Sequence, residues 1–116
     1  AVGSGATSWD SSMPSPTLKE TTLTKEIGRK AISTSDISFL DPNLLTKVST
    51  PTNLIEVTVT FGTNECNGVW REFGLFGGKA TTALNSGHMI NKKHHSILTK
   101  TTDMTVERNI QLSLTF

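Results

Sequence analysis

The chain has 116 residues, 11 basic and 10 acidic side chains, a net charge of +1 and a single cysteine. This length allows one domain with one core, and the lone cysteine excludes a disulfide within the chain. The charges form no run of one sign and no apolar stretch reaches the roughly 20 residues that cross a bilayer, so we expect neither a nucleic-acid partner nor a membrane partner.

The composition predicts a thin core with a preference for β-structure. Only 34% of the residues belong to the apolar set AVILMFWYC, whereas 19 are threonines, whose branched side chains suit a half-buried pleated surface. Without a disulfide, contacts between subunits are the leading way to supplement such a core. We therefore expect a mainly β protein that forms a homo-oligomer, with a trimer as the favoured form.

The N-terminal part predicts an arm followed by one short helix. Residues 1–16 are mostly Gly, Ala, Ser, Thr and Pro, which favours an extended N-terminal arm, and they lack the charged and apolar regions of a signal peptide. The spacing of Leu18, Leu23 and Ile27 then fits a helix that begins near residue 17 and ends near Gly28. We assign residues 17–116 to a single domain resembling an antiparallel β-sandwich.

Alternating apolar and polar residues predict the strands of this domain. The clearest pattern covers residues 55–61, and residues 69–76 follow a polar loop, so the two segments are expected to form a hairpin. A further alternation covers the last residues from Val106 to Phe116, interrupted by Arg108, which we expect near the solvent end. The remaining expected strands are residues 29–39, 88–90 and 96–98, the last two flanking a bend at 91–95.

One nine-residue segment carries a family resemblance. The sequence WREFGLFGG, residues 70–78, resembles the signature of phage tail-collar and tail-fibre attachment proteins. The order and spacing of five other segments are similar to related short phage proteins. These segments are residues 1–5, 23–31, 85–91, 97–101 and 110–116.

The resemblance implies a structural protein of a bacteriophage particle, assembled in the bacterial host cytoplasm and located in the virion. Its expected role is assembly or attachment in the tail, as a collar, baseplate or fibre connector that contacts other virion proteins. The alternatives are a cement or decoration protein on the capsid and, with less support, a binder of a host receptor or carbohydrate. The chain has no Tyr and only two Trp to stack against sugars, which disfavours the last alternative.

Two groups of candidate functional residues follow. Trp9 is expected to contact a neighbouring subunit, with packing against its own domain as the alternative, because Trp is enriched at interfaces; Glu72 is expected to be partly buried and paired with Arg29, with a wet face as the alternative. The candidate interface residues are Trp9, Val2, Gly3 and Gly5. The candidate structural-motif residues are Arg29, Trp70, Glu72, Phe73, Gly74, Leu75 and Phe76.

The sequence predicts no catalytic residue, cofactor or metal site. His88, His94 and His95 are the only histidines, and neighbouring residues of a strand point to opposite faces, which argues against chelation by the last two. A shared site on a symmetry axis is the alternative for one of them. Cys66 and Ser96 lie in no motif that supplies a base and an oxyanion site, so a nucleophilic role is disfavoured.

Overall fold

The computed structural model describes residues 1–114, which form a mainly β protein with two antiparallel four-stranded sheets. The chain divides into two compact units. One contains residues 1–30 and 62–105, and the other contains residues 31–61 and the segment from Val106 onwards. The expected mainly β, antiparallel class is therefore confirmed; Thr115 and Phe116, the end of the last expected strand, lie outside the described residues.

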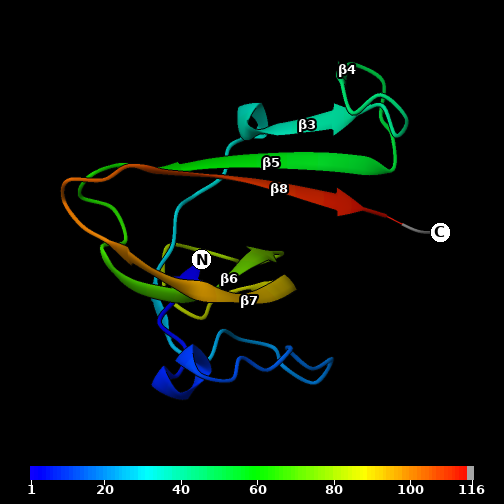
Figure 1. The fold of residues 1–116 in the computed structure, drawn as a ribbon. Coiled ribbons are helices and arrows are strands. Elements are labelled where there is room, and N and C mark those ends of the chain that lie inside the picture. The colour runs from blue at the N-terminus through cyan, green and yellow to red at the C-terminus, as the bar shows by residue number, and fades with distance from the viewer. Residues whose placement is uncertain (115–116) are drawn as a thin grey trace. The chain divides into compact units, whose positions relative to one another are not determined.

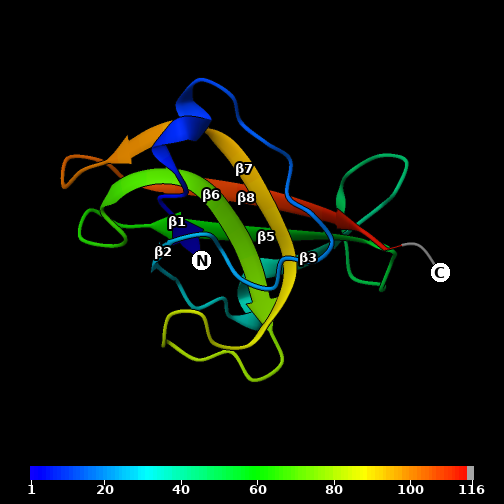
Figure 2. The ribbon, with the colours of Figure 1, turned by 90° about the horizontal axis from the view of Figure 1, so that it is seen from below.

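The first unit contains a sheet with the strand order β2-β1-β6-β7, in which the three last strands lie side by side (Figure 2). Val2 and Gly3 of the expected arm form β1 and lie opposite Phe73 and Glu72 of β6. A single 3-10 turn, η1, spans Thr7–Asp10. The strands are β1 (Val2–Gly3), β2 (Glu26–Gly28), β6 (Gly68–Gly77) and β7 (His88–Lys100).

The strand β7 is one continuous element of 13 residues, so the predicted bend at 91–95 is wrong. Its pairing with β6 shifts register twice, between Trp70 and Glu72 and between Leu75 and Phe76. Such bulges break the strict alternation of faces along a strand. Between the two shifts residues 91–94 pair regularly with β6, and this part gave no recognisable strand pattern because its side chains are polar on both faces.

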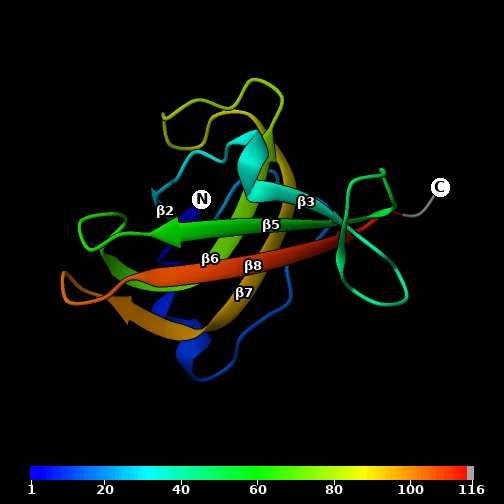
Figure 3. The same ribbon diagram turned by 90° about the horizontal axis from the view of Figure 1, so that it is seen from above.

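The second unit contains a sheet with the order β4-β3-β5-β8 (Figures 1 and 3). Strands β5 and β8 pair over eight residues without a register shift, which follows from the uninterrupted alternation in both sequences. Val57 and Val59 of β5 are buried, as their side of the alternation predicts. The strands are β3 (Ile37–Leu40), β4 (Lys47–Val48), β5 (Leu54–Phe61) and β8 (Val106–Ser113), preceded by a 3-10 turn, η2 (Thr34–Asp36).

The predicted hairpin of residues 55–61 and 69–76 is wrong, although both strands exist. The first belongs to the sheet of β3 and β8, and the second belongs to the sheet of β1 and β7. The intervening loop is held in the unit of β6, where Lys100 donates to the carbonyl of Gly62 at 2.6 Å. This bond, from a strand distant in sequence, attaches the start of the loop to the first unit.

The predicted helix over residues 17–28 is also wrong. Only 3-10 turns are helical among the described residues, and the segment instead ends in β2 with Leu23 and Glu26 buried. The spacing of three apolar residues indicated a helix, but tertiary contacts of the backbone decide the structure here. Of the strand predicted over residues 29–39, only the part from Ile37 onwards is strand, in β3. Ser33 and Asp36 form a reciprocal capping box around η2 before β3 begins.

Candidate functional site

The WREFGLFGG motif forms β6, which lies between β1 and β7 and organises the first unit. Trp70 is fully buried, and its indole N–H donates to the carbonyl of Cys66 at 2.7 Å. Leu75 is buried as well. A Cβ atom on Gly74 would lie 2.8 Å from the carbonyl oxygen of Asn91, so the backbone of β7 approaches this glycine closely.

The carboxylate of Glu72 is completely buried and accepts three backbone hydrogen bonds. Its Oε2 accepts from the N–H groups of Gly5 at 3.1 Å and Lys25 at 2.8 Å, and its Oε1 accepts from Thr24 at 2.7 Å. The ammonium of Lys92 lies 3.6 Å from Oε1 and compensates the buried charge. Glu72 therefore joins two ends of one segment, residues 5–25, to the middle of β6.

The predicted pair of Glu72 with Arg29 is wrong, because Arg29 pairs with Glu26 of β2. The guanidinium donates through Nε and Nη2 to the two carboxylate oxygens of Glu26, both at 2.8 Å. The hydrogen bonds with Glu26 raise the pKa of Arg29. Glu72 is buried, as expected, but three backbone N–H groups and the ammonium of Lys92 occupy the place that was assigned to Arg29.

Arg29 also fixes the loop between β6 and β7. Its Nη1 donates to the carbonyls of Thr81 and Ser86, both at 3.1 Å, and its Cζ lies 4.8 Å from the ring centroid of Phe76. The backbone N–H of Asn85 donates to Glu26 at 3.2 Å. The Glu26–Arg29 pair thus forms hydrogen bonds with three residues of this loop.

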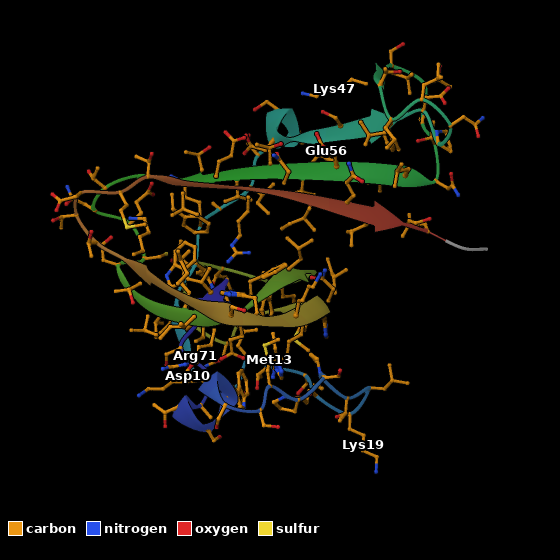
Figure 4. The ribbon with its side chains drawn as sticks, in the orientation of Figure 1. Asp10, Met13, Lys19, Lys47, Glu56 and Arg71 are labelled. Atoms are coloured by element: carbon orange, nitrogen blue, oxygen red, sulfur yellow. The ribbon has the colours of Figure 1, made fainter. Side chains whose placement is uncertain are left out.

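Arg71 joins β6 to the N-terminal segment at a second point (Figure 4). Its Nε and Nη2 donate to the two oxygens of Asp10 at 2.8 and 3.0 Å, and its Nη1 donates to the carbonyl of Ser4 at 2.9 Å. The hydrogen bond from Arg71 lowers the pKa of Asp10. Strict alternation would send Arg71 and Glu72 to opposite faces, and the register shift at this position allows both to reach residues 4–25.

Two residues of β7 complete this attachment. Lys92 donates to Glu20 at 2.6 Å, which lowers the pKa of that carboxyl, and its side chain is only 2% exposed. The ring of His94 stacks on Trp9 with centroids 3.9 Å apart, and its Nδ1 lies 2.6 Å from the carbonyl oxygen of Pro14. We call residues 4–25, held by Arg71, Glu72, Lys92 and His94, the N-terminal strap.

The four candidate interface residues lie within the first unit. Val2 is buried in β1, and a Cβ atom on Gly3 would lie 2.4 Å from Oε2 of Glu72. Gly5 has a φ of 57° and packs against the ring of Trp9. Trp9 is half-buried, so its contact with a neighbouring subunit stays a prediction that concerns the part of the ring not covered by His94.

The histidines and the cysteine are dispersed. His94 turns towards the strap, whereas the ring of His95 lies 6.0 Å from that of Phe73, in keeping with the opposite directions expected for neighbours. Among residues 1–114, no three His, Cys, Asp or Glu side chains gather closely enough to hold a metal ion. Cys66 has a φ of 54°, and burial raises the pKa of its thiol.

Four residues with structural roles escaped sequence reasoning. Asp10, Glu20, Lys92 and Lys100 lie in no motif, and each gains its role only when segments distant in sequence meet. No local sequence pattern distinguishes these four residues from surface polar residues.

In the part of the chain that the structure describes, no helix is long and apolar enough to cross a bilayer. Comparison of the chain with protein-family models, with curated proteins and with solved structures gives no significant match in any of the three.

Proposed function

We propose that the chain is a structural module of a bacteriophage particle that acts in tail assembly or attachment through contacts with other virion proteins. The observation that carries the proposal is the structural role of the WREFGLFGG motif in the first unit. Its two charged residues, Arg71 and Glu72, bind the N-terminal strap. The residues that carry the resemblance to tail-collar and tail-fibre proteins thus hold the fold together, as expected for a structural protein.

The proposal extends to the packing of the two sheets as a β-sandwich. In β5 the alternation places Val57, Val59 and Phe61 on one face, and all three are buried. The apolar face of an antiparallel sheet must be buried against another layer. In a β-sandwich two such sheets bury their apolar faces against each other. The buried Trp70 and Leu75 of β6 give the other sheet its apolar side chains.

Exposed leucines in fixed loops support a role in protein contacts. Leu18 protrudes from the strap with its side chain fully exposed, and Leu44 is 74% exposed in the loop between β3 and β4. Asp41 fixes this second loop by accepting hydrogen bonds from the N–H groups of Asn43 and Leu44 at 2.8 and 2.9 Å. A loop held in one conformation loses little further entropy on binding, so its apolar tip is suited to a partner's pocket.

We further propose that the chain forms a homo-oligomer, with three copies as the favoured number. Light scattering coupled to size exclusion measures this directly, and Leu18→Ser and Leu44→Ser test whether the exposed leucines take part. A matched control is Lys19→Ala, which removes an exposed side chain from the same strap. A strictly monomeric wild-type chain at high concentration contradicts the oligomer but leaves the virion role to the next test.

The virion role is tested by locating the chain in purified particles of the phage that encodes it. Antibodies raised against the purified chain are expected to label the tail in electron micrographs. Label on the head would replace the tail role by a cement or decoration role. Absence of the chain from washed, intact particles would refute both placements and with them the proposal.

A further inference from the structure

Lys100, the last residue of β7, has a buried ammonium that donates to two neutral oxygens. Its side chain is 1% exposed, and its Nζ donates to the carbonyl of Gly62 at 2.6 Å and to Oδ1 of Asn67 at 2.7 Å. No ion pair joins it to a carboxylate among the described residues. The carboxylate of Glu65, which is paired with Lys30, acts on Lys100 only from beyond ion-pair distance. A buried ammonium is best compensated by an anion, so this position favours any change that creates one.

Asn67, the partner of Lys100, has the chemistry for such a change. It is the only one of the seven asparagines in the chain that precedes a glycine. Gly68 has no side chain to obstruct the approach of its own backbone nitrogen to the amide carbon of Asn67. The residue is also exposed, so water reaches the amide.

The hydrogen bonds of Asn67 match the charges of the reaction. Lys100 holds Oδ1, the atom that becomes negative when a nucleophile adds to the amide carbon, and a fixed cation there stabilises the transition state. The amide nitrogen donates to the carbonyl of Thr63 at 2.9 Å, which orients the group that leaves. The nucleophile is Gly68, since the ammonium of Lys100 acts as the stabilising charge.

We propose that Asn67 is a self-modification site, at which the amide converts to a carboxylate that pairs with Lys100. The backbone nitrogen of Gly68 bonds to the side-chain carbon of Asn67, and water carries the proton of Gly68 to the amide nitrogen. That nitrogen leaves as ammonia, and a five-membered succinimide remains. One water molecule then opens the ring and restores the Gly68 peptide bond, with a carboxylate at position 67. No oxidant or cofactor takes part.

The fold selects between the two products of ring opening. Opening at the side-chain carbonyl restores the normal backbone and leaves a carboxylate oxygen at the position of Oδ1, beside Lys100. Opening at the backbone carbonyl adds a methylene group to the main chain directly before β6 and disturbs its register with β7, in which Gly68 lies opposite Lys100. The aspartate product is therefore the one that the folded chain retains.

Peptide mapping by mass spectrometry tests the proposal during incubation of the folded chain. Asn67 is expected to deamidate faster than each of the other six asparagines and faster than in a synthetic peptide of residues 62–72, which lacks Lys100. Lys100→Met should slow the folded-state reaction at least about tenfold, whereas Lys100→Arg, which keeps the charge, should slow it less. If Lys100→Met does not fold, the comparison of the folded chain with the peptide decides.

A second readout concerns the product. Asn67→Asp, which supplies the carboxylate from the start, should raise the urea midpoint above that of the unmodified chain, while Asn67→Gln should not deamidate. Reaction at Asn67 no faster in the folded chain than in the peptide would refute the role of Lys100. Loss of ammonia with a hydroxylamine-resistant link between residues 67 and 100 would also overturn the proposal, because Lys100 would then be the nucleophile.

Discussion

Arg71 and Asp10, 61 positions apart in the sequence, meet in a two-point hydrogen bond between guanidinium and carboxylate. The arginine lies in the central strand β6 and the aspartate lies at the end of η1, so the pair joins the N-terminal strap to the sheet. Because Asp10 is on the surface, water screens the pair and its effect on global stability is small. Its main effect is local, on the strap.

Asp10→Asn should therefore loosen the strap without unfolding the chain. We expect faster cleavage of residues 11–19 by a protease at low concentration, with little change in the urea midpoint. Lys19→Ala provides the control, because it changes the same strap without removing a described ion pair. Equal cleavage rates for Asp10→Asn and the wild type would show that the other attachment points hold the strap alone.

Glu72→Gln should destabilise the whole first unit. The amide presents an N–H group where the carboxylate accepted backbone N–H groups, and an unsatisfied buried group costs about 2 to 3 kcal/mol. Urea denaturation measures the loss. Glu107→Gln is the matched control, since Glu107 is exposed on β8 and the same substitution there should be nearly neutral.

Gly3→Ala tests the same cradle from the opposite side. The added methyl group would lie 2.4 Å from Oε2 of Glu72 and 2.7 Å from the carbonyl oxygen of Lys25, and backbone cannot move aside cheaply. We expect a loss of about 1 to 3 kcal/mol in unfolding free energy. Gly77→Ala should cost less, because its methyl group would meet only the flexible end of Ile90 at 3.1 Å. Equal losses in the two variants would contradict the close packing around Gly3.

The pH dependence follows from the carboxyl groups of the strap. The pKa values of Asp10 and Glu20 are lowered in the folded chain by hydrogen bonds from Arg71 and Lys92. Stabilisation of this kind is complete above the ordinary carboxyl pKa near 4 and is lost as the pH falls through the folded-state values. The protection of the strap from hydrogen exchange, measured against the unfolded chain at the same pH, should fall below about pH 4, and Glu20→Gln combined with Asp10→Asn should flatten this dependence.

Leu45 offers a stability gain in the second unit. It adopts a φ of 57°, a left-handed conformation that costs a leucine roughly 1 kcal/mol and a glycine little. Leu45→Gly should raise the unfolding free energy by at most about 0.5 kcal/mol, because the flexibility of glycine in the unfolded chain offsets about 0.4 to 1 kcal/mol of the relief. Leu44→Gly, whose φ is not positive, should give no gain, and a gain in both variants would point to loss of the exposed leucine side chain.

The sequence predicted those parts of the fold that depend on local pattern. Strands β5, β6 and β8 were visible because apolar residues alternate or cluster there, and the mainly β class followed from the threonines. The predicted helix over residues 17–28 was wrong because the spacing of a few apolar residues does not decide local structure. The predicted hairpin of residues 55–61 and 69–76 was wrong because proximity along the chain does not determine which strands pair. The partners of Glu72 could not be predicted, because they are backbone groups of a segment 47 to 67 positions away.

Glu72 gathers Gly5 and Thr24 at one carboxylate, so the residues between them form a loop whose two ends are fixed at the same point. The cost of closing such a loop grows only slowly with its length, by roughly 0.6 kcal/mol for each doubling. The tip of this loop, residues 15–19, lies after the contact of Pro14 with His94 and before that of Glu20 with Lys92, and can therefore accept inserted sequence with little effect on the sheet beneath it. This geometry makes the tip a natural place to display a foreign peptide on the chain.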